Sequence, residues 1–236
     1  MAGFNFNHTP KDVPLINTKY RKIVTKIPTP ESVVMLEQAY GLESRSMHGQ
    51  MPVVWDRADN FQVFDAQGNS WIDFTSTIFV ANAGHGNPRI VEAVKKVLDK
   101  PLLHTYTYLS QERLDYLDLL IEKTPKQFEK VFMLSAGTEA TECALKLMRE
   151  QGAKKGKRKG VVVCIEGNWH GRTLGAQMMG WNPAQKAWIG YHDPNILHIP
   201  FPYPWDPVVG KDPKQFFKDG IKNLCDEHGL DPTKDL

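Results

Sequence analysis

Cysteine is scarce in this sequence, with three residues, Cys143, Cys164 and Cys225, in a chain of 236. The number is odd, the residues lie far apart, and no pair has the C-x-x-C spacing of a zinc site. Neither a disulfide framework nor a metal site is therefore expected. We predict that all three are buried free thiols in a reducing compartment, and hence that the protein is cytoplasmic.

An excess of charge of one sign is also missing, because 29 Lys and Arg against 27 Asp and Glu leave a formal net charge of +2. This balance predicts no charge-driven partner such as nucleic acid. The basic loop from Lys154 to Lys159 has no aromatic residue between its charges, and we interpret it as a solvated connection. No apolar run approaches the roughly 18 residues of a membrane helix, and the N-terminus lacks the core of a secretory signal. No membrane partner is expected.

The sequence does contain enough hydrophobic residues, 41%, for the core of one domain or two small ones. Residues 1–30 are polar and interrupted by proline, which predicts a surface arm. Alternating apolar residues on both sides of A-Q-G-N predict a hairpin between residues 61 and 74. Amphipathic patterns with capping residues predict helices at residues 87–98, 110–125 and 212–229, each with an apolar face in the core.

Apolar runs alternate with helical patterns between residues 131 and 199. Buried strands are predicted for V-F-M-L at 131–134, V-V-V-C-I at 161–165 and I-L-H-I at 196–199. The intervening pattern predicts a helix at 139–149 with Glu142 and Lys146 paired on its outer face. Its predicted buried face consists of Ala140, Cys143, Ala144, Leu147 and Met148. Strands that alternate with helices predict an α/β fold with a parallel sheet, in which ligands bind beyond the carboxyl ends of the strands.

The first loop at such an end is S-A-G-T, residues 135–138. Unpaired backbone N–H groups and the helix dipole favour an anion there, Gly137 allows a close approach, and Thr138 adds a hydroxyl donor. A phosphate group fits these features. The alternative is an ordinary strand-to-helix turn in which Thr138 caps the helix and Glu139 is a first-turn acid.

The second loop is E-G-N-W-H-G-R-T, residues 166–173, and it places Trp169, His170 and Arg172 after a buried strand. Trp169 can stack on a planar heterocycle whose phosphate lies on the first loop, and Arg172 offers a planar fork for a carboxylate. Taken alone, Trp169 and His170 are equally compatible with packing roles. The two loops together favour a ligand site.

Three segments resemble one family. L-S-A-G-T-E-A-T-E-C-A-L-K-L-M-R is similar to the phosphate-binding segment of class III, or ω-amino acid, pyridoxal-phosphate aminotransferases. G-N-W-H-G-R-T-L-G-A resembles their ring-stacking segment, and W-I-D-F-T-S-T-I-F-V-A-N-A-G-H-G-N-P-R-I resembles their entry into the large domain. The order and spacing also agree, so the resemblance covers the chain from about Pro52 onward.

The resemblance implies a fold-type-I aminotransferase, a homodimer with active sites at the subunit interface. It implies that pyridoxal 5′-phosphate moves an amino group from an amine or ω-amino acid donor to a 2-oxo acid such as 2-oxoglutarate. The chain departs from the family pattern at Ala136, beside Gly137, and at Thr77, where glycine is common. The departure at Thr77 leaves the substrate open, because the larger side chain can narrow the pocket. The residues implied for the cofactor are Gly137, Thr138, Trp169 and His170, and those implied for the substrate are Arg172, for its carboxylate, and Ile78, in its pocket.

The resemblance also assigns residues 1–75 to the N-terminal arm and part of the small domain, and residues 76–236 to the first part of the cofactor-binding large domain. The family needs a lysine that binds the cofactor covalently and an acid that pairs with its pyridine nitrogen. No lysine here has a matching context, so no catalytic residue is assigned and we expect this chain to be inactive alone. Two alternatives stay open: a lysine-less binding or regulatory protein with this fold, and an unrelated α/β binder of phosphate ligands.

Overall fold

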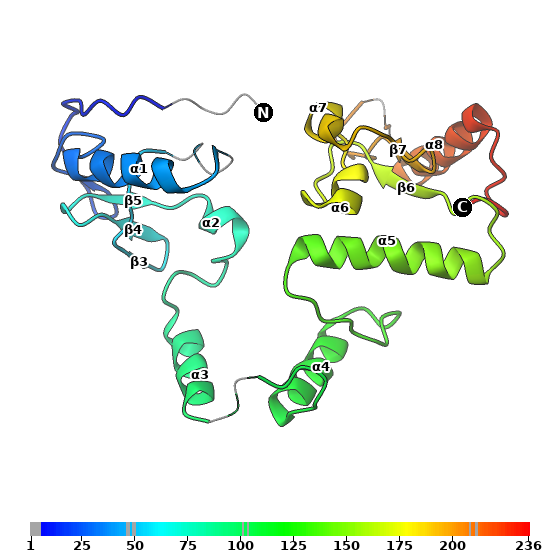
Figure 1. The fold of residues 1–236 in the computed structure, drawn as a ribbon, viewed down its shortest axis with the longest axis horizontal. Helices are drawn as coiled ribbons and strands as arrows, with labels where there is room; N and C mark the ends of the chain where they lie inside the picture. The colour runs from blue at the N-terminus through cyan, green and yellow to red at the C-terminus, as the bar shows by residue number, and fades with distance from the viewer. Residues whose placement is uncertain are drawn as a thin grey trace. The chain divides into compact units, whose positions relative to one another are not determined.

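The computed structural model describes residues 6–45, 48, 51–100, 102, 104–207, 209–210 and 212–236. These residues belong to two compact units, residues 2–115 and residues 116–236, and most of their helices and strands are labelled in Figure 1. The boundary predicted between residues 75 and 76 separates the two domains of a complete enzyme, whereas these units meet at residues 115 and 116. The predicted boundary therefore stays a prediction.

The first unit contains an antiparallel sheet with the strand order β1-β2-β5-β4-β3. The predicted hairpin is confirmed, because β4 and β5 pair in antiparallel register with Val63 opposite Trp71. The segment predicted as an arm contributes more than expected, since it supplies β1 and β2. The elements of this part are β1 Ile16–Asn17, β2 Lys22–Ile23, α1 Pro30–Leu42, β3 Arg57–Asp59, β4 Gln62–Phe64 and β5 Ser70–Ile72.

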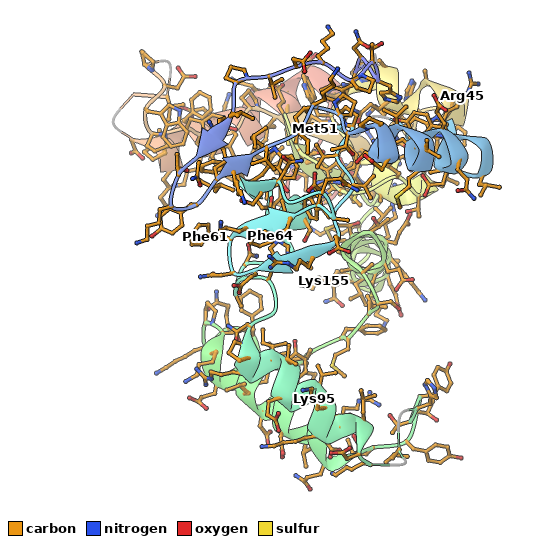
Figure 2. All side chains as sticks on the ribbon, turned by 90° about the vertical axis from the view of Figure 1, so that its left-hand side faces the viewer. Arg45, Met51, Phe61, Phe64, Lys95 and Lys155 are labelled. Atoms are coloured by element: carbon orange, nitrogen blue, oxygen red, sulfur yellow. The ribbon has the colours of Figure 1, made fainter. Side chains whose placement is uncertain are left out.

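Aromatic contacts join the segments of this sheet beyond its backbone hydrogen bonds. The guanidinium carbon of Arg57 in β3 lies 3.6 Å from the ring centre of Phe64 in β4. Tyr20, between β1 and β2, meets Phe61 edge-on with ring centres 5.2 Å apart. Figure 2 shows Phe61 and Phe64 beside the strands of this unit. Such contacts each contribute about 0.5–1.5 kcal/mol beyond the apolar area that they bury.

A left-handed turn follows β5. The short element α2, Ser76–Phe79, has φ angles of 46°, 54°, 56° and 78° at its successive residues, none of which is glycine. Each non-glycine residue in this region costs roughly 1–2 kcal/mol. Thr77, the position where the family commonly has glycine, lies in the middle of this strained run.

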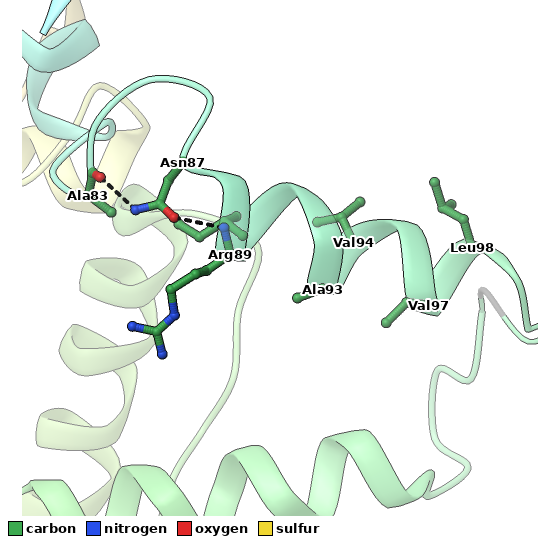
Figure 3. A pocket seen from close by; sticks show the side chains of 8 residues that line it. Ala83, Asn87, Arg89, Ala93, Val94, Val97 and Leu98 are labelled. Atoms are coloured by element: carbon green, nitrogen blue, oxygen red, sulfur yellow. Dashed lines mark hydrogen bonds between the residues drawn. The ribbon is translucent and has the colours of Figure 1, made fainter. Parts of the chain in front are cut away.

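Two amphipathic helices in this part of the chain have exposed apolar faces. Helix α3, Pro88–Leu98, begins as predicted, with Asn87 Oδ1 accepting the amide hydrogen of Arg89 at 3.0 Å. The predicted burial is wrong, because no residue of α3 is buried and Val94 is 52% exposed. Its apolar residues line the groove shown in Figure 3. Helix α4, Gln111–Lys123, likewise has no buried residue. An amphipathic pattern identifies an apolar face but cannot supply the element that covers it.

The second unit is built around two parallel strands, β6 Val162–Ile165 and β7 Ile196–Ile199. This pairing confirms the predicted parallel sheet at both of these segments. The other elements are α5 Gly137–Lys154, α6 Leu174–Met178, α7 Pro183–Lys186, the 3-10 helix η2 Ala187–Ile189, and α8 Pro213–His228. The central hydrophobic cluster consists of Leu145, Val162, Cys164, Met179 and Ile196.

One predicted strand and two predictions of burial are wrong in this unit. Residues 131–134 do not form a strand, and Phe132 is 68% exposed, because the described residues contain no neighbouring strand for this segment. Helix α5 buries Leu145 and not the predicted face, of which Leu147 is 47% exposed. Cys143 is half-buried, whereas Cys164 and Cys225 are buried free thiols as predicted.

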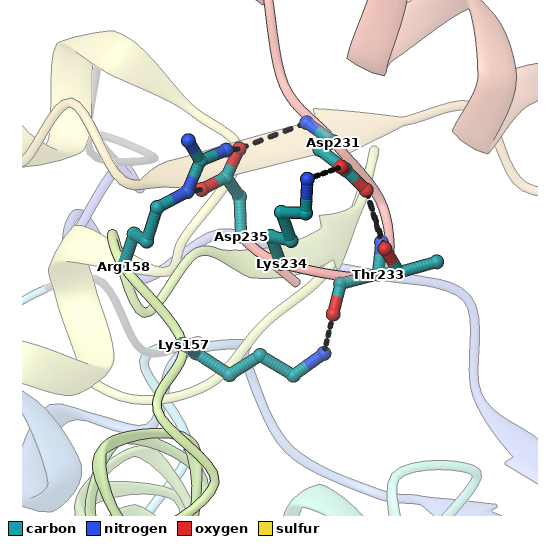
Figure 4. A network of polar contacts seen from close by, with 6 residues as sticks. All are labelled: Lys157, Arg158, Asp231, Thr233, Lys234 and Asp235. Atoms are coloured by element: carbon teal, nitrogen blue, oxygen red, sulfur yellow. Dashed lines mark hydrogen bonds and ion pairs between the residues drawn. The ribbon is translucent and has the colours of Figure 1, made fainter.

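The segment after α8 returns to the beginning of β6. Helix α8 ends at the predicted Gly229, with a φ of 59°. The amide of Val161 then donates to the carbonyl of Asp235 at 3.0 Å. The buried carboxylate of Asp235 accepts hydrogen bonds from Arg158 Nε and Nη2 at 3.0 and 2.8 Å, and from the amide of Asp231 at 2.8 Å (Figure 4). Part of the basic loop therefore has a structural partner.

We expect Thr77→Gly to stabilise the protein. Glycine adopts the left-handed region without the steric cost, although it loses more backbone entropy on folding, so the net gain should be about 0.5–1 kcal/mol. The measurement is the midpoint of urea unfolding at unchanged slope. Thr107→Gly is the control, because Thr107 is exposed and has no positive φ. A midpoint that falls in both variants would contradict the strain at residue 77.

Candidate cofactor site

The N-terminus of α5 provides free backbone donors. The helix begins at Gly137, and its N-cap is Ala136, with φ −151° and ψ 165°, which has no side-chain oxygen to cap the first turn. Thr138 therefore lies inside the first turn and is not the cap, whereas Glu139 is a first-turn acid, as the alternative stated from sequence expects. The first-turn N–H groups have no intrahelical acceptor, and with the helix dipole they favour an anion.

There is room for a ligand beside these donors. A Cβ atom built on Gly137 would have no atom of the described residues within 4 Å. The preceding loop is held by Glu139, whose Oε2 accepts the amide hydrogen of Ser135 at 2.9 Å. The helix terminus thus combines exposed N–H groups, the Thr138 hydroxyl and open space, which is what a phosphate group requires.

The loop at residues 166–173 packs directly on this helix. Gly171 is buried at a φ of 127°, and a Cβ atom there would lie 2.6 Å from Thr138 Cγ2 and 2.9 Å from Thr138 Cβ. The next turn of the helix adds a hydrogen bond from Thr141 Oγ1 to the carbonyl of His170, 2.6 Å long. Glycine at position 171 is required by both the backbone angle and the space. The two loops predicted to act together are therefore in contact.

Glu142 strengthens the same junction, and sequence reasoning missed it. Its carboxylate accepts hydrogen bonds from the hydroxyl of Thr173 and from the amide of Ala176, the latter at 3.0 Å. The predicted outer pair of Glu142 with Lys146 is therefore wrong. Burial raises the pKa of Glu142, but the hydrogen bonds from Thr173 and from the amides of Ala176 and Gly175 outweigh it, so the pKa is lowered. A carboxylate one turn after a phosphate-binding loop could have indicated this contact.

Asn168 fixes the other end of the loop. Its Nδ2 donates to the carbonyls of Ile165 and Met179 at 2.6 and 3.1 Å. Its Oδ1 accepts the amide hydrogen of Trp181 at 3.2 Å. The loop is thus anchored on both sides of its aromatic and basic residues.

Trp169 and Arg172 lie together on the surface of this loop. The guanidinium carbon of Arg172 is 5.2 Å from the ring centre of Trp169, within range of a cation–π interaction. Trp169 is 60% exposed, so its ring remains accessible. His170 lies between these two residues in the sequence. Burial lowers the pKa of His170, which favours its neutral imidazole at pH 7. The loop therefore presents an aromatic face, a neutral imidazole and a restrained planar cation.

Ile78, the remaining predicted site residue, belongs to the first unit. It lies in the left-handed turn α2 and is 79% exposed. The contacts of the second unit therefore bring together Gly137, Thr138, Trp169, His170 and Arg172, and the assignment of Ile78 stays a prediction.

Comparison with known structures defines the class of the fold. The taurine:2-oxoglutarate aminotransferase of Bifidobacterium kashiwanohense, solved with pyridoxal phosphate and glutamate, superposes with a TM-score of 0.67 over 84% of this chain and 44% of its own. The sequence identity is 23%. The fold is that of the fold-type-I transaminases, present in part.

The sequence comparison identifies the family. The model of the family described as aminotransferase class-III matches residues 44–231, so the chain belongs to the class III aminotransferases, which depend on pyridoxal phosphate. The acetylornithine aminotransferase of Methanopyrus kandleri is 30% identical over 204 residues, which is 78% of this chain and 51% of that protein. An alanine/serine racemase of Pyrococcus horikoshii is 28% identical over 89% of this chain and 44% of its own length. The chain spans about half the length of these relatives.

Two further structural findings concern membranes and metal ions. Within the described residues, every helix is too short or too polar to cross a membrane. The same residues contain no group of three or more His, Cys, Asp or Glu side chains placed to hold a metal ion.

We predict that Gly171→Ala weakens the binding of pyridoxal phosphate. The added methyl group would overlap Thr138 and move its hydroxyl, at a cost of about 1–3 kcal/mol. The measurement is the dissociation constant from quenching of tryptophan fluorescence. Gly190→Ala is the control, because Gly190 also has a positive φ, of 77°, but has open space around it. Equal loss of affinity in both variants would show that backbone strain alone is responsible.

We also expect Glu142 to contribute stability that depends on pH. Because its folded pKa lies below the ordinary value of 4.5, its stabilising effect is complete above that pH and is lost as the pH falls further. Glu142→Gln removes the charge and should cost about 1–2 kcal/mol at pH 7 and less at pH 3. Urea unfolding at both pH values tests this, with Glu227→Gln, at an exposed position of helix α8, as the surface control. A constant difference between Glu142→Gln and the parent at both pH values would exclude the effect.

Proposed function

We propose that this chain forms the cofactor-phosphate and ring-binding part of an aminotransferase. The enzyme would transfer an amino group from an amine or ω-amino acid to a 2-oxo acid such as 2-oxoglutarate. The observation that carries this proposal is the contact between Thr138 and Gly171, which joins an anion-binding helix terminus to a loop that bears an aromatic ring and an arginine. An unrelated phosphate-binding protein would use the helix terminus, but it would not explain why Trp169 and Arg172 lie together on the adjoining loop.

Each residue has a distinct task in this proposal. The first-turn N–H groups at Gly137 and Thr138, with the Thr138 hydroxyl, bind the cofactor phosphate. Trp169 packs against the pyridine ring, with neutral His170 beside it. Pyridoxal phosphate, when bound, supplies an electron-withdrawing ring that stabilises negative charge at the substrate carbon. Arg172 binds the substrate carboxylate through two parallel hydrogen bonds, and contact with Trp169 limits its orientations before the substrate arrives.

The proposal assigns the covalent link to the cofactor to no lysine of this chain. Among the lysines that the structure describes, Lys186 has a pKa that burial lowers. Its ammonium group donates to the carbonyls of Gly180 and Met178, at 2.8 and 3.4 Å. These bonds give Lys186 a structural task at the end of α6, so we do not nominate it.

Two further features belong to the proposal. We propose a homodimer with active sites at the subunit interface, which the exposed apolar faces of α3 and α4 support, since an apolar stripe is stabilised when it is covered. We also propose a cytoplasmic location, which the free thiols favour.

The first test is the binding of pyridoxal phosphate to this chain, and Thr138→Val should weaken it by about 1–2 kcal/mol through loss of one charge-assisted donor. Thr107→Val is the matched surface control. Tryptophan quenching by pyridoxal phosphate but not by a nucleotide is the expected result. Quenching by the nucleotide alone would replace the proposal with an unrelated phosphate binder.

The second test concerns Arg172 in the full-length enzyme. Arg172→Lys keeps the charge but loses the planar fork, so the KM for glutamate or 2-oxoglutarate should rise and kcat/KM should fall about tenfold to a hundredfold. Cofactor affinity should not change. Equal losses for amine donors with and without a carboxylate would show that Arg172 only holds its own loop.

A further inference from the structure

A buried carboxylate lies outside the cofactor site, at Asp73 in the segment after β5. Its side chain is 2% exposed. Oδ1 accepts hydrogen bonds from the amide and hydroxyl of Thr75, at 2.8 and 2.6 Å, and from the amide of Ser76, at 3.1 Å. Oδ2 lies 2.8 Å from Nε2 of His85. Burial raises the pKa of Asp73, but these hydrogen bonds outweigh it and lower the pKa to about 2, so the group is ionised at neutral pH.

The hydrogen bonds of Asp73 reach the beginning of the left-handed turn. Ser76 is the first residue of that turn, and its carbonyl closes the turn by accepting the amide hydrogens of Val80 and Ala81, each at 2.8 Å. Such a run of non-glycine residues is unfavourable on its own, so neighbouring contacts must determine it. Among the contacts of the described residues, the hydrogen bonds of Thr75 and Ser76 to Asp73 connect the start of the turn to a buried carboxylate.

His85 anchors the other side of the pair. Its backbone forms an antiparallel bridge with Asn60, with hydrogen bonds of 2.8 and 2.7 Å. Its ring meets the ring of Trp55 edge-on, with centres 6.1 Å apart. The amide of Asp73 itself donates to the carbonyl of Phe61 at 2.8 Å. Both members of the pair are therefore attached to the residues around β3 and β4, and the turn extends from this attachment.

We propose that Asp73, through its pair with His85, is a positioning residue that holds the turn Ser76–Phe79 left-handed and so fixes the direction in which Ile78 is presented. Two observations support the assignment: a strained backbone without glycine, and a buried carboxylate whose contacts end at that backbone. The consequence for substrate recognition rests on the proposed function, in which Ile78 lines the substrate pocket. In that setting a change at Asp73 would raise KM for the amino donor without changing cofactor affinity.

Amide hydrogen exchange in this chain tests the proposal without any cofactor. Asp73→Ala should speed exchange of the Val80 and Ala81 amides about 5- to 30-fold relative to amides of β4, because the turn opens locally. His85→Ala should have a smaller effect in the same direction, since the hydrogen bonds to Thr75 and Ser76 remain. Adding Thr77→Gly to Asp73→Ala should restore slow exchange, because glycine relieves the strain that the carboxylate offsets.

Asp65→Ala is the matched control, because Asp65 is also buried and also accepts hydrogen bonds from its own turn. It should change exchange in the β4–β5 hairpin and leave Val80 and Ala81 unaffected. If Asp73→Ala does not fold, Asp73→Asn, which keeps the acceptor for Thr75 and Ser76, takes its place with a smaller expected effect. Uniform acceleration of all amides without rescue by Thr77→Gly would overturn the proposal. Failure of the parent chain to bind pyridoxal phosphate, although its turn is intact, would instead contradict the proposed function.

Discussion

The packing of the Gly171 backbone against the Thr138 side chain is the constraint on which the candidate site depends. It leaves no space for a side chain at position 171, and it fixes the second loop two residues from Trp169 and one from Arg172. Thr141 and Glu142, on the following turn of α5, extend the same contact by hydrogen bonds. The helix terminus proposed for the phosphate and the loop proposed for the ring are thereby held together, as preorganised recognition requires.

Two features of the chain cost free energy of folding unless other contacts offset them. The left-handed turn has a strained backbone, and the apolar faces of α3 and α4 are exposed to water. The first cost is met within the chain, by the buried carboxylate of Asp73. The second is not met by the described residues, in keeping with a chain that spans about half the length of its relatives. Local hydrogen bonds thus stabilise what lies near in sequence, whereas broad apolar faces need distant segments or a partner.

The parts predicted from sequence are those governed by short-range patterns. The hairpin, the parallel strands β6 and β7, and the ends of α3 and α8 follow from alternation, apolar runs and capping residues. The two loops were located because they follow predicted strands and carry anion-binding, aromatic and basic groups, and the resemblance then implied the individual roles, that of Ile78 included. Burial was predicted poorly: residues 132–134 and most of the predicted apolar face of α5 are exposed, because periodicity cannot reveal whether a covering element is present. Glu142 was misplaced because an i,i+4 pair with Lys146 satisfied the local rule, whereas its actual partner lies 31 residues away at Thr173.

The central claim is that the first turn of α5 and the loop at residues 166–173 bind one molecule of pyridoxal phosphate. A crystal structure of this chain grown with pyridoxal phosphate tests it most directly. We expect the phosphate within hydrogen-bond distance of the Gly137 and Thr138 amides and the pyridine ring stacked on Trp169. A phosphate bound elsewhere, or one at α5 whose ring points away from Trp169, would contradict it.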